Sequence, residues 1–418
     1  MEIKINNMFR NICSVLCFVI LCFFIVGHIS INNDLTPDSK LYYGLSENIK
    51  SGVGYYDTIR NSEILPPVGH PLLLLALGYL TTKITIVQLF LGLLSLVFAV
   101  AIYTRSNIIT LILCFCIFLT LRSVAFLNYG IEASIFMLSS FLILSFVYVY
   151  KNDFSLFSII ISSIFVAVHI LVRPLLFYPV VLFVLTLIGY SIYIYIKYKA
   201  FSFYSRRIKM VLVGFLSIFI IVGAVSTLSL VCYGDKRLTK GTYSSIPLYV
   251  ANNEYIPVDI VYSSNVLSTY VPKDKINYLF SVSDGWEKRQ SRIFNEVVKY
   301  VFQHPKRAVA GWLWRFSQYT GVAFNVSDKL FVYTVLVYLN FLLILLLIII
   351  CVVKKNHAFL FSSLGLLIIT LLMMQIFQMA LFVWVGGYRF LVPLIPFLVT
   401  GVLFSLFEVK TLLTFKEN

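Results

Sequence analysis

A mostly apolar run at residues 331–353, without one charged side chain, constrains the fold of this chain most strongly. A segment of about 20 mostly apolar residues is long enough to cross the hydrocarbon core of a bilayer as a helix. Similar runs recur along the chain, which is 60% hydrophobic and only 12% charged. Soluble globular domains are about 25% charged. The sequence therefore predicts an all-α polytopic membrane protein.

The basic residues that give a net charge of +15 fall largely in short loops between apolar runs. Lys and Arg in such loops mark the cytoplasmic side of a membrane protein, so the charge needs no nucleic-acid partner. Lys4 and Arg10 place the N-terminus in the cytoplasm, and the dense basic cluster at residues 197–209 marks the same side. The cysteines lie in or beside apolar runs without metal-ligand spacing, so we interpret them as core residues and expect no metal site built from them.

About ten membrane spans follow from the apolar runs and the basic loops, with both termini in the cytoplasm. They are expected near residues 11–31, 84–104, 107–126, 134–150, 154–172, 175–196, 210–232, 331–353, 358–383 and 390–407. The chain then divides into an N-terminal transmembrane bundle (1–232), a large external loop (233–330) and C-terminal transmembrane helices (331–418).

The first external loop, residues 33–82, is expected to hold juxtamembrane helices. Tyr42, Leu45 and Ile49 predict a short amphipathic helix, and the run at 71–80 is too short to span and should lie along the interface. In the large external loop, residues 286–302 and 307–316 are amphipathic enough for two helices on the bundle or the membrane surface.

With this topology the unusual polar residues all face outward. A carboxylate at the mouth of an apolar bundle is costly to desolvate, so its presence points to a site. The gathering of carboxylates and arginines on one side favours a reaction at the outer face. The residues are Asp34, Asp38 and His70 in the first external loop, Glu132 in the second, Arg173 in the third and Arg389 in the last.

Several motifs, in order along nearly the whole chain, carry a resemblance. They are D-S-K-L-Y-Y-G-L-S-E-N-I-K-S-G-V-G-Y, L-P-P-V-G-H-P-L-L-L-L-A-L, Y-G-I-E-A-S-I-F, L-V-R-P-L-L-F-Y-P, P-L-Y-V-A-N-N and Y-R-F-L-V-P-L-I-P. Together they resemble the polytopic GT-C glycosyltransferases of the protein O-mannosyltransferase and lipid A aminoarabinose transferase type, which use a polyprenyl-phosphate-sugar donor. Chain size and composition resemble the serotype-converting glucosyltransferases of O-antigen.

The resemblance implies that Asp38 is the catalytic aspartate of the first loop and Glu132 the second acidic residue, at the external start of the fourth span. Ser39 stands where the family often has a further acid, which leaves dependence on a divalent cation open. A sugar phosphate already has a good leaving group, so the site needs a base for the acceptor hydroxyl and cations for the phosphate. Asp38 suits the first role, and Arg173 or Arg389 suits the second because a guanidinium forks onto two oxygens.

Substrate-binding roles are expected for Tyr42, His70, Asn252 and Asn253, and each candidate has a simpler structural alternative. Asp38 caps a helix, Glu132 complements a helix dipole, the two arginines are interface or helix-end residues, and His70 and the two asparagines shape turns. His169 is expected to be a packed interior residue.

The expected function is transfer of a sugar from the polyprenyl-phosphate donor to an extracytoplasmic glycan or lipid acceptor, of O-antigen or lipopolysaccharide type. The expected location is the bacterial inner membrane, with the active site on the periplasmic face. Two alternatives stay open. An O-antigen polymerase or ligase would rely on external arginines, and a lipid-linked sugar transporter should carry charged residues in mid-span.

Overall fold

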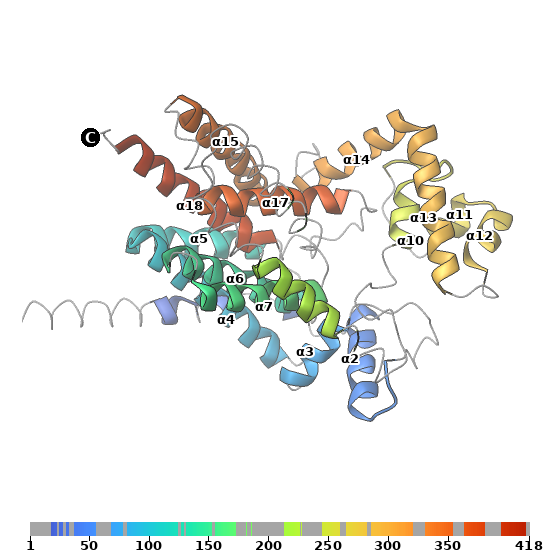
Figure 1. Ribbon diagram of the computed structural model, residues 1–418, viewed down its shortest axis with the longest axis horizontal. Coiled ribbons are helices and arrows are strands. Elements are labelled where there is room, and N and C mark those ends of the chain that lie inside the picture. Colours follow the sequence, from blue (N-terminus) through green and yellow to red (C-terminus); the bar gives the residue numbers. More distant parts are fainter. Residues whose placement is uncertain are drawn as a thin grey trace, which may run out of the picture.

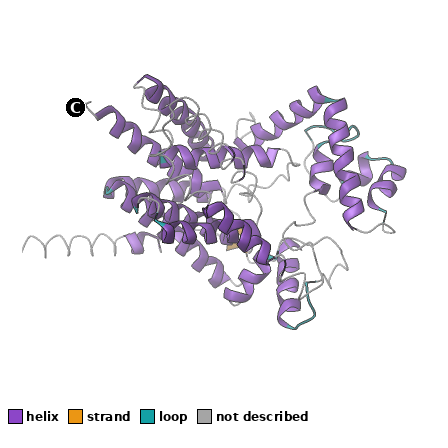
Figure 2. Ribbon diagram, in the orientation of Figure 1, coloured by secondary structure: helices purple, strands orange, loops and turns teal. Residues whose placement is uncertain are grey.

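The structure is a computed structural model of the chain. It describes residues 18–22, 25–27, 31–32, 37–55, 68–77, 82–123, 127–128, 131–152, 155–172, 181, 185, 213–225, 227, 245–259, 265–281, 286–320, 331–353, 363–380 and 394–414. Within these ranges it is helical apart from one pair of very short strands, as Figure 2 shows. The prediction of an all-α protein is therefore confirmed.

The helices follow one another from residue 37 to the C-terminal part of the chain. Their bounds are α2 Pro37–Lys50, α3 Gly69–Leu77, α4 Thr82–Thr104, α5 Asn107–Ser123, α6 Ile131–Lys151, α7 Leu156–Val172, α10 Ser245–Ala251, α11 Val266–Tyr270, α12 Lys273–Phe280, α13 Trp286–Gln303, α14 Pro305–Thr320, α15 Phe331–Val353, α17 Leu364–Ala380 and α18 Ile395–Thr414. The strands are β1 Ile31–Asn32 and β2 Leu127–Asn128.

Among the described residues, four helices are long and apolar enough to cross a membrane, and they indicate a multi-pass membrane protein. They are Thr85–Thr104, Glu132–Lys151, Val332–Val353 and Ile395–Thr414. The shorter helices α5, α7 and α17 lie where the third, fifth and ninth spans were expected. The expected sixth span, 175–196, falls almost wholly outside the described residues.

The last long helix, α18, differs from the expected boundary. The sequence predicted a span near 390–407, whereas α18 begins at Ile395 and continues to Thr414. Pro396 suits the first turn of a helix, because its missing N–H would have no intrahelical partner there. The helix continues past Glu408, whose carboxylate is buried and hydrogen-bonded, and a hydropathy pattern does not reveal such partners.

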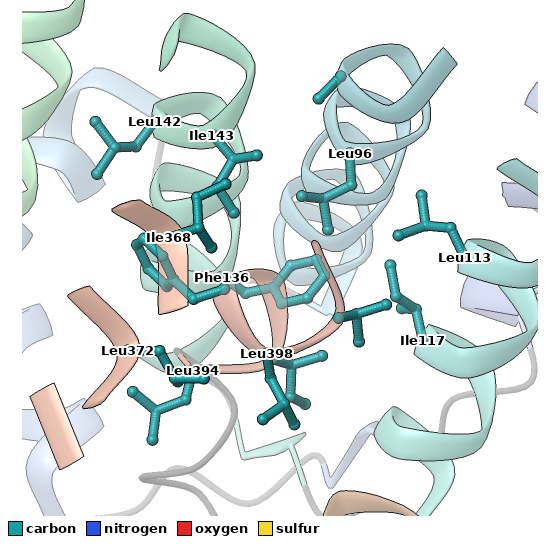
Figure 3. Close-up of a cluster of buried hydrophobic side chains, with 14 of the residues drawn as sticks. Leu96, Leu113, Ile117, Phe136, Leu142, Ile143, Ile368, Leu372, Leu394 and Leu398 are labelled. Carbon is teal, nitrogen blue, oxygen red and sulfur yellow. The ribbon is translucent and has the colours of Figure 1, made fainter. Parts of the chain in front are cut away.

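One hydrophobic core joins the two ends of the chain. Figure 3 shows side chains from α4, α5, α6 and α17 and from the start of α18 meeting in one cluster. The N-terminal and C-terminal transmembrane segments therefore form one bundle. The labelled residues are Leu96, Leu113, Ile117, Phe136, Leu142, Ile143, Ile368, Leu372, Leu394 and Leu398.

The described part of residues 233–330, the segment expected to be a large external loop, contains helices α10 to α14 and stands beside the bundle (Figure 1). It has a core of its own, built from Tyr249, Val250, Ile256, Val266, Val271, Leu279, Ile293 and Val297. Helix α14 reaches back from this subdomain and contacts α17. The two helices expected near 286–302 and 307–316 are confirmed as α13 and α14.

Candidate functional site

The first element of the site is α2, which carries Asp38 as its second residue. Pro37 occupies the first position, for which its fixed φ is suited, and a carboxylate in the first turn is stabilised by the helix dipole. The helix is anchored because Leu41 and Leu45 are buried against Tyr55 and Val68. The amphipathic helix expected here is confirmed, while the side chain of Asp38 lies outside the described part.

The second element is α3, which buries His70 completely. The ring of Tyr42 on α2 stands edge-on to the imidazole, with ring centroids 4.7 Å apart. Among the residues that the structure describes, neither imidazole nitrogen has a hydrogen-bond partner, and burial lowers the pKa of His70 to about 3. Residues four apart lie on one face of a helix, so Asp38 shares a face of α2 with the tyrosine that contacts His70.

A very close backbone approach holds α3 against α7. A Cβ added at Gly69 would overlap the backbone of Leu171 and Val172, so only glycine fits there. Leu73 of α3 packs beside Ile135 of α6 and Val172 of α7. The contact thus places His70 near the end of α7. This helix ends directly before Arg173, which itself lies outside the described residues.

Glu132 belongs to the same region through two connections. It stands in the first turn of α6 and is only 4% exposed, three residues before the Ile135 that packs with α3. In addition, β1 pairs in parallel with β2, so that Ile31 faces Leu127 and Asn32 faces Asn128. The strands thus bring together the chain just before α2, which carries Asp38, and the chain just before α6, which carries Glu132.

The two asparagines of the large loop have intramolecular partners. Asn252 Oδ1 accepts a hydrogen bond from Trp312 Nε1 at 2.7 Å, and its amide donates to Leu248 O. Asn253 Oδ1 accepts from the backbone N–H groups of Tyr255 and Ile256. These contacts agree with the turn-shaping alternative and additionally tie α10 to α14.

The remaining expectations are placed as follows. Arg389 and Asp34 lie outside the described residues. His169 is buried and hydrogen-bonded to Ser139 at 3.0 Å, which confirms the packed interior histidine. Cys22, Cys114 and Cys351 are buried, as core residues should be. Within the described residues no cluster of His, Cys, Asp and Glu has the arrangement of a metal site.

Arg315 is a buried cation that the sequence did not single out. It lies on α14, is 2% exposed, and donates from Nε to Ala380 O, at the end of α17, at 2.7 Å. Its Nη2 has no hydrogen-bond partner among the described residues. Burial lowers the pKa of Arg315 to about 10, so the group stays charged at neutral pH. The sequence signal that could have pointed to the burial of Arg315 is Gly311, one turn earlier in the helix. A Cβ at that position would stand 3.2 Å from Nη1.

Glu408 is a second buried ionisable residue that sequence reasoning missed. Its Oε1 accepts hydrogen bonds from Tyr103 Oη and from the backbone N–H groups of Leu364 and Gly365, and its Oε2 accepts one from Ser363 Oγ. The carboxylate thereby caps the N-terminus of α17, where the first N–H groups of a helix have no intrahelical partner. Because these hydrogen bonds satisfy the carboxylate, its burial in a candidate span is explained by a structural role, that of a clamp between helices.

The fold defines the class: within the described residues the protein is all-helical, and its four long apolar helices indicate a multi-pass membrane protein. Comparisons of the chain with protein-family models, with curated proteins and with solved structures found no match.

Proposed function

We propose that this protein is a membrane glycosyltransferase that moves a sugar from a polyprenyl-phosphate-linked donor to an extracytoplasmic glycan or lipid acceptor. The observation that carries the proposal is the pairing of β1 with β2, which adjoins the segments that lead to Asp38 and Glu132. The packing of α2 on α3 and of α3 on α7 adds His70 to the same region. The order of sequence motifs supports the reaction class.

In the proposed reaction, the acceptor hydroxyl oxygen attacks the anomeric carbon of the sugar. Asp38 takes the hydroxyl proton while the bond between the anomeric carbon and the phosphate oxygen breaks. The polyprenyl phosphate leaves with the bonding electrons and needs no acid to protonate it. Glu132 orients Asp38 or the acceptor, and a general base of this kind contributes roughly a hundred- to ten-thousand-fold in rate.

His70 suits a binding role in this reaction better than a base role. A neutral imidazole has one donor and one acceptor nitrogen, and neither nitrogen of His70 has a hydrogen-bond partner within the described part of the chain. Leaving a buried polar group unpaired costs about 1–3 kcal/mol, so a sugar hydroxyl that pairs with it gains affinity. Tyr42 fixes the ring by its edge-on contact.

The proposed topology keeps about ten spans, with the site on the outer, periplasmic face of a bacterial inner membrane and both termini inside. Single cysteines at the exposed positions Ser51 and Ser268 should react with an impermeant reagent in intact cells whose outer membrane has been made permeable, in a variant without native cysteines. A cysteine at the exposed Asn107 should react only after lysis. Labelling of Asn107→Cys in intact cells would put Asp38 on the wrong face for this donor.

The function itself is tested by the cell-surface glycan. Asp38→Asn keeps the side-chain size but removes the base, whereas Asp34→Asn is the matched control in the same loop. Mass spectrometry should find the sugar missing from the glycan of Asp38→Asn cells and present in Asp34→Asn cells, at equal protein abundance. If the Asp38→Asn glycan equals that of the parent, a polymerase, ligase or transporter becomes the better reading.

A further inference from the structure

The bend between α13 and α14 presents apolar side chains that no described residue covers. Phe302, in the last turn of α13, is 81% exposed, and Leu313 of α14 is 63% exposed. The other face of each helix is packed against protein. Ile293 and Val297 lie in the core that α13 shares with α10 and α12, and α14 packs on α17. The exposed side chains are therefore the outward faces of helices whose inward faces already have partners.

Lysines alternate with these apolar side chains. On α13, Lys299 lies one turn before Phe302, and on α14 Lys306, Val309 and Leu313 follow one another at the three- and four-residue spacing of a single helix face. All five side chains are exposed. We call these five residues the bend face.

The charge of this surface has one sign. Every exposed charged side chain among residues 288–320 is basic. Glu296 of α13 is half-buried and forms an ion pair with Lys275 at 2.6 Å. The bend face is therefore a basic surface, and the partner that complements it is anionic.

The mixture of lysine with large apolar side chains fits a lipid surface better than a protein surface. Lysine is depleted in protein–protein interfaces, most of all in their buried centres. At a membrane surface, lysine extends its ammonium group to the headgroups, while Phe and Leu enter the boundary of the acyl chains. Phe302 beside Lys299, and Leu313 beside Lys306, have this arrangement.

Helix α14 keeps the bend face close to the membrane, because it leads from the bundle to the bend (Figure 1). Phe316 of α14 contacts Phe341 of α15, with ring centroids 6.3 Å apart, and the Tyr333 hydroxyl of α15 donates a hydrogen bond to Tyr319 O. α15 contains one of the candidate membrane spans. A helix of 16 residues is about 24 Å long, so the bend lies within about that distance of the bundle.

We infer that the bend face docks on the surface of the membrane in which the chain is embedded. Phe302 and Leu313 enter the boundary of the acyl chains, and Lys299 and Lys306 contact the headgroups of anionic phospholipids. The subdomain of α10 to α14 is then held at two points, by α14 on the bundle and by the bend face on lipid. The docking needs no sugar transfer and stands apart from the proposed function.

The test measures the depth of a nitroxide label on the full chain in nanodiscs of phosphatidylcholine, with or without phosphatidylglycerol. Phe302→Cys and Leu313→Cys carry the label in a variant without native cysteines, and Asn277→Cys, exposed on α12, is the control. With phosphatidylglycerol, oxygen, which dissolves in lipid, should relax the labels at residues 302 and 313 more strongly than a water-soluble nickel complex does. The order should be reversed at residue 277.

A matched pair of lysine variants tests the headgroup contact. Lys306→Gln should lower the ratio of docked to free protein about fivefold, since this is roughly what one lysine contributes at an anionic membrane surface. Lys273→Gln, the same loss of charge at an exposed position of α12, should leave the ratio unchanged. With the native cysteines retained, brominated phospholipid should quench the added fluorescence of Phe302→Trp but not that of Asn277→Trp.

Three results would overturn the inference. Labels at residues 302 and 313 that respond like the label at residue 277 would show that the bend face stays in water. Protection of these labels from both oxygen and the nickel complex would show that a protein surface, such as a second copy of the chain, covers the bend face. Equal insertion in pure phosphatidylcholine would remove the role of the lysines and of the anionic headgroups.

Discussion

The ring of Tyr42 stands edge-on to the buried imidazole of His70, with planes at 89°. This contact joins α2 to α3 and sets the environment in which His70 stays neutral. Burial holds the pKa of His70 at about 3, below the ordinary value of 6.5. At a pH between these two values, the unfolded chain therefore binds a proton on this histidine that the folded chain does not bind. Stability should therefore fall as the pH drops below 6.5 and should not change through this group above it.

A first prediction follows for His70→Gln, which cannot titrate. The parent should lose about 2 kcal/mol through this group between pH 7.5 and pH 5, and the variant should be spared that loss. Melting temperatures of the purified protein across this range measure it. His304→Gln, at an exposed histidine on the α13–α14 connection, is the control and should follow the parent. Parallel curves for the parent and His70→Gln would show that His70 is not buried as described.

The second prediction concerns Gly69. An added methyl group overlaps the backbone of α7, so Gly69→Ala should move α3 away from Leu171 at a cost of about 1–3 kcal/mol and should sharply lower sugar transfer. Gly223→Ala is the matched control in residues 213–225, because an added Cβ there meets nothing within 4 Å. The comparison is made by melting temperature and glycan analysis. Equal behaviour of the two variants would refute the close packing of α3 on α7.

The third prediction concerns Glu408. Glu408→Ala leaves the Tyr103 and Ser363 hydroxyls and two backbone N–H groups without their acceptor, which should cost about 3 kcal/mol or more. Glu408→Gln keeps one carbonyl acceptor, and its amide can donate to Ser363 Oγ, so abundance and transfer should stay near those of the parent. Abundance in membranes and melting temperature measure both variants.

Glu408 also separates the proposed function from the transporter alternative. A proton- or ion-coupling carboxylate would lose its role in Glu408→Gln even though the protein folds. Normal abundance with complete loss of function in this variant would therefore favour transport, whereas retained transfer supports the structural clamp.

The bundle helices were predictable from the sequence because hydropathy and length decide them. The run at 331–353 became α15 with the expected bounds, and 84–104 became most of α4. The end of α18 was not predictable in this way, because it depends on Glu408 meeting donors from α4 and α17, far apart in the sequence.

The candidate site was predictable in its residue types but not in its contacts. A carboxylate beside an apolar span and a histidine before a proline are visible in the sequence, which singled out Asp38 and His70. The burial of Arg315 was not visible, because α14 reads as a basic amphipathic helix and only its packing on α17 hides this arginine. For Asn252 and Asn253 the sequence left a substrate-binding role and a turn-shaping role open, because only the backbone geometry distinguishes them.

The central claim is that Asp38 is the base of a sugar transfer at the outer face. The most direct measurement is the rate at which purified protein transfers sugar from a polyprenyl-phosphate donor to its acceptor, for the parent, Asp38→Asn and Asp34→Asn. We predict a loss of roughly a hundred- to ten-thousand-fold for Asp38→Asn, with unchanged binding of polyprenyl phosphate, and a normal rate for Asp34→Asn. An Asp38→Asn rate equal to that of the parent would contradict the account.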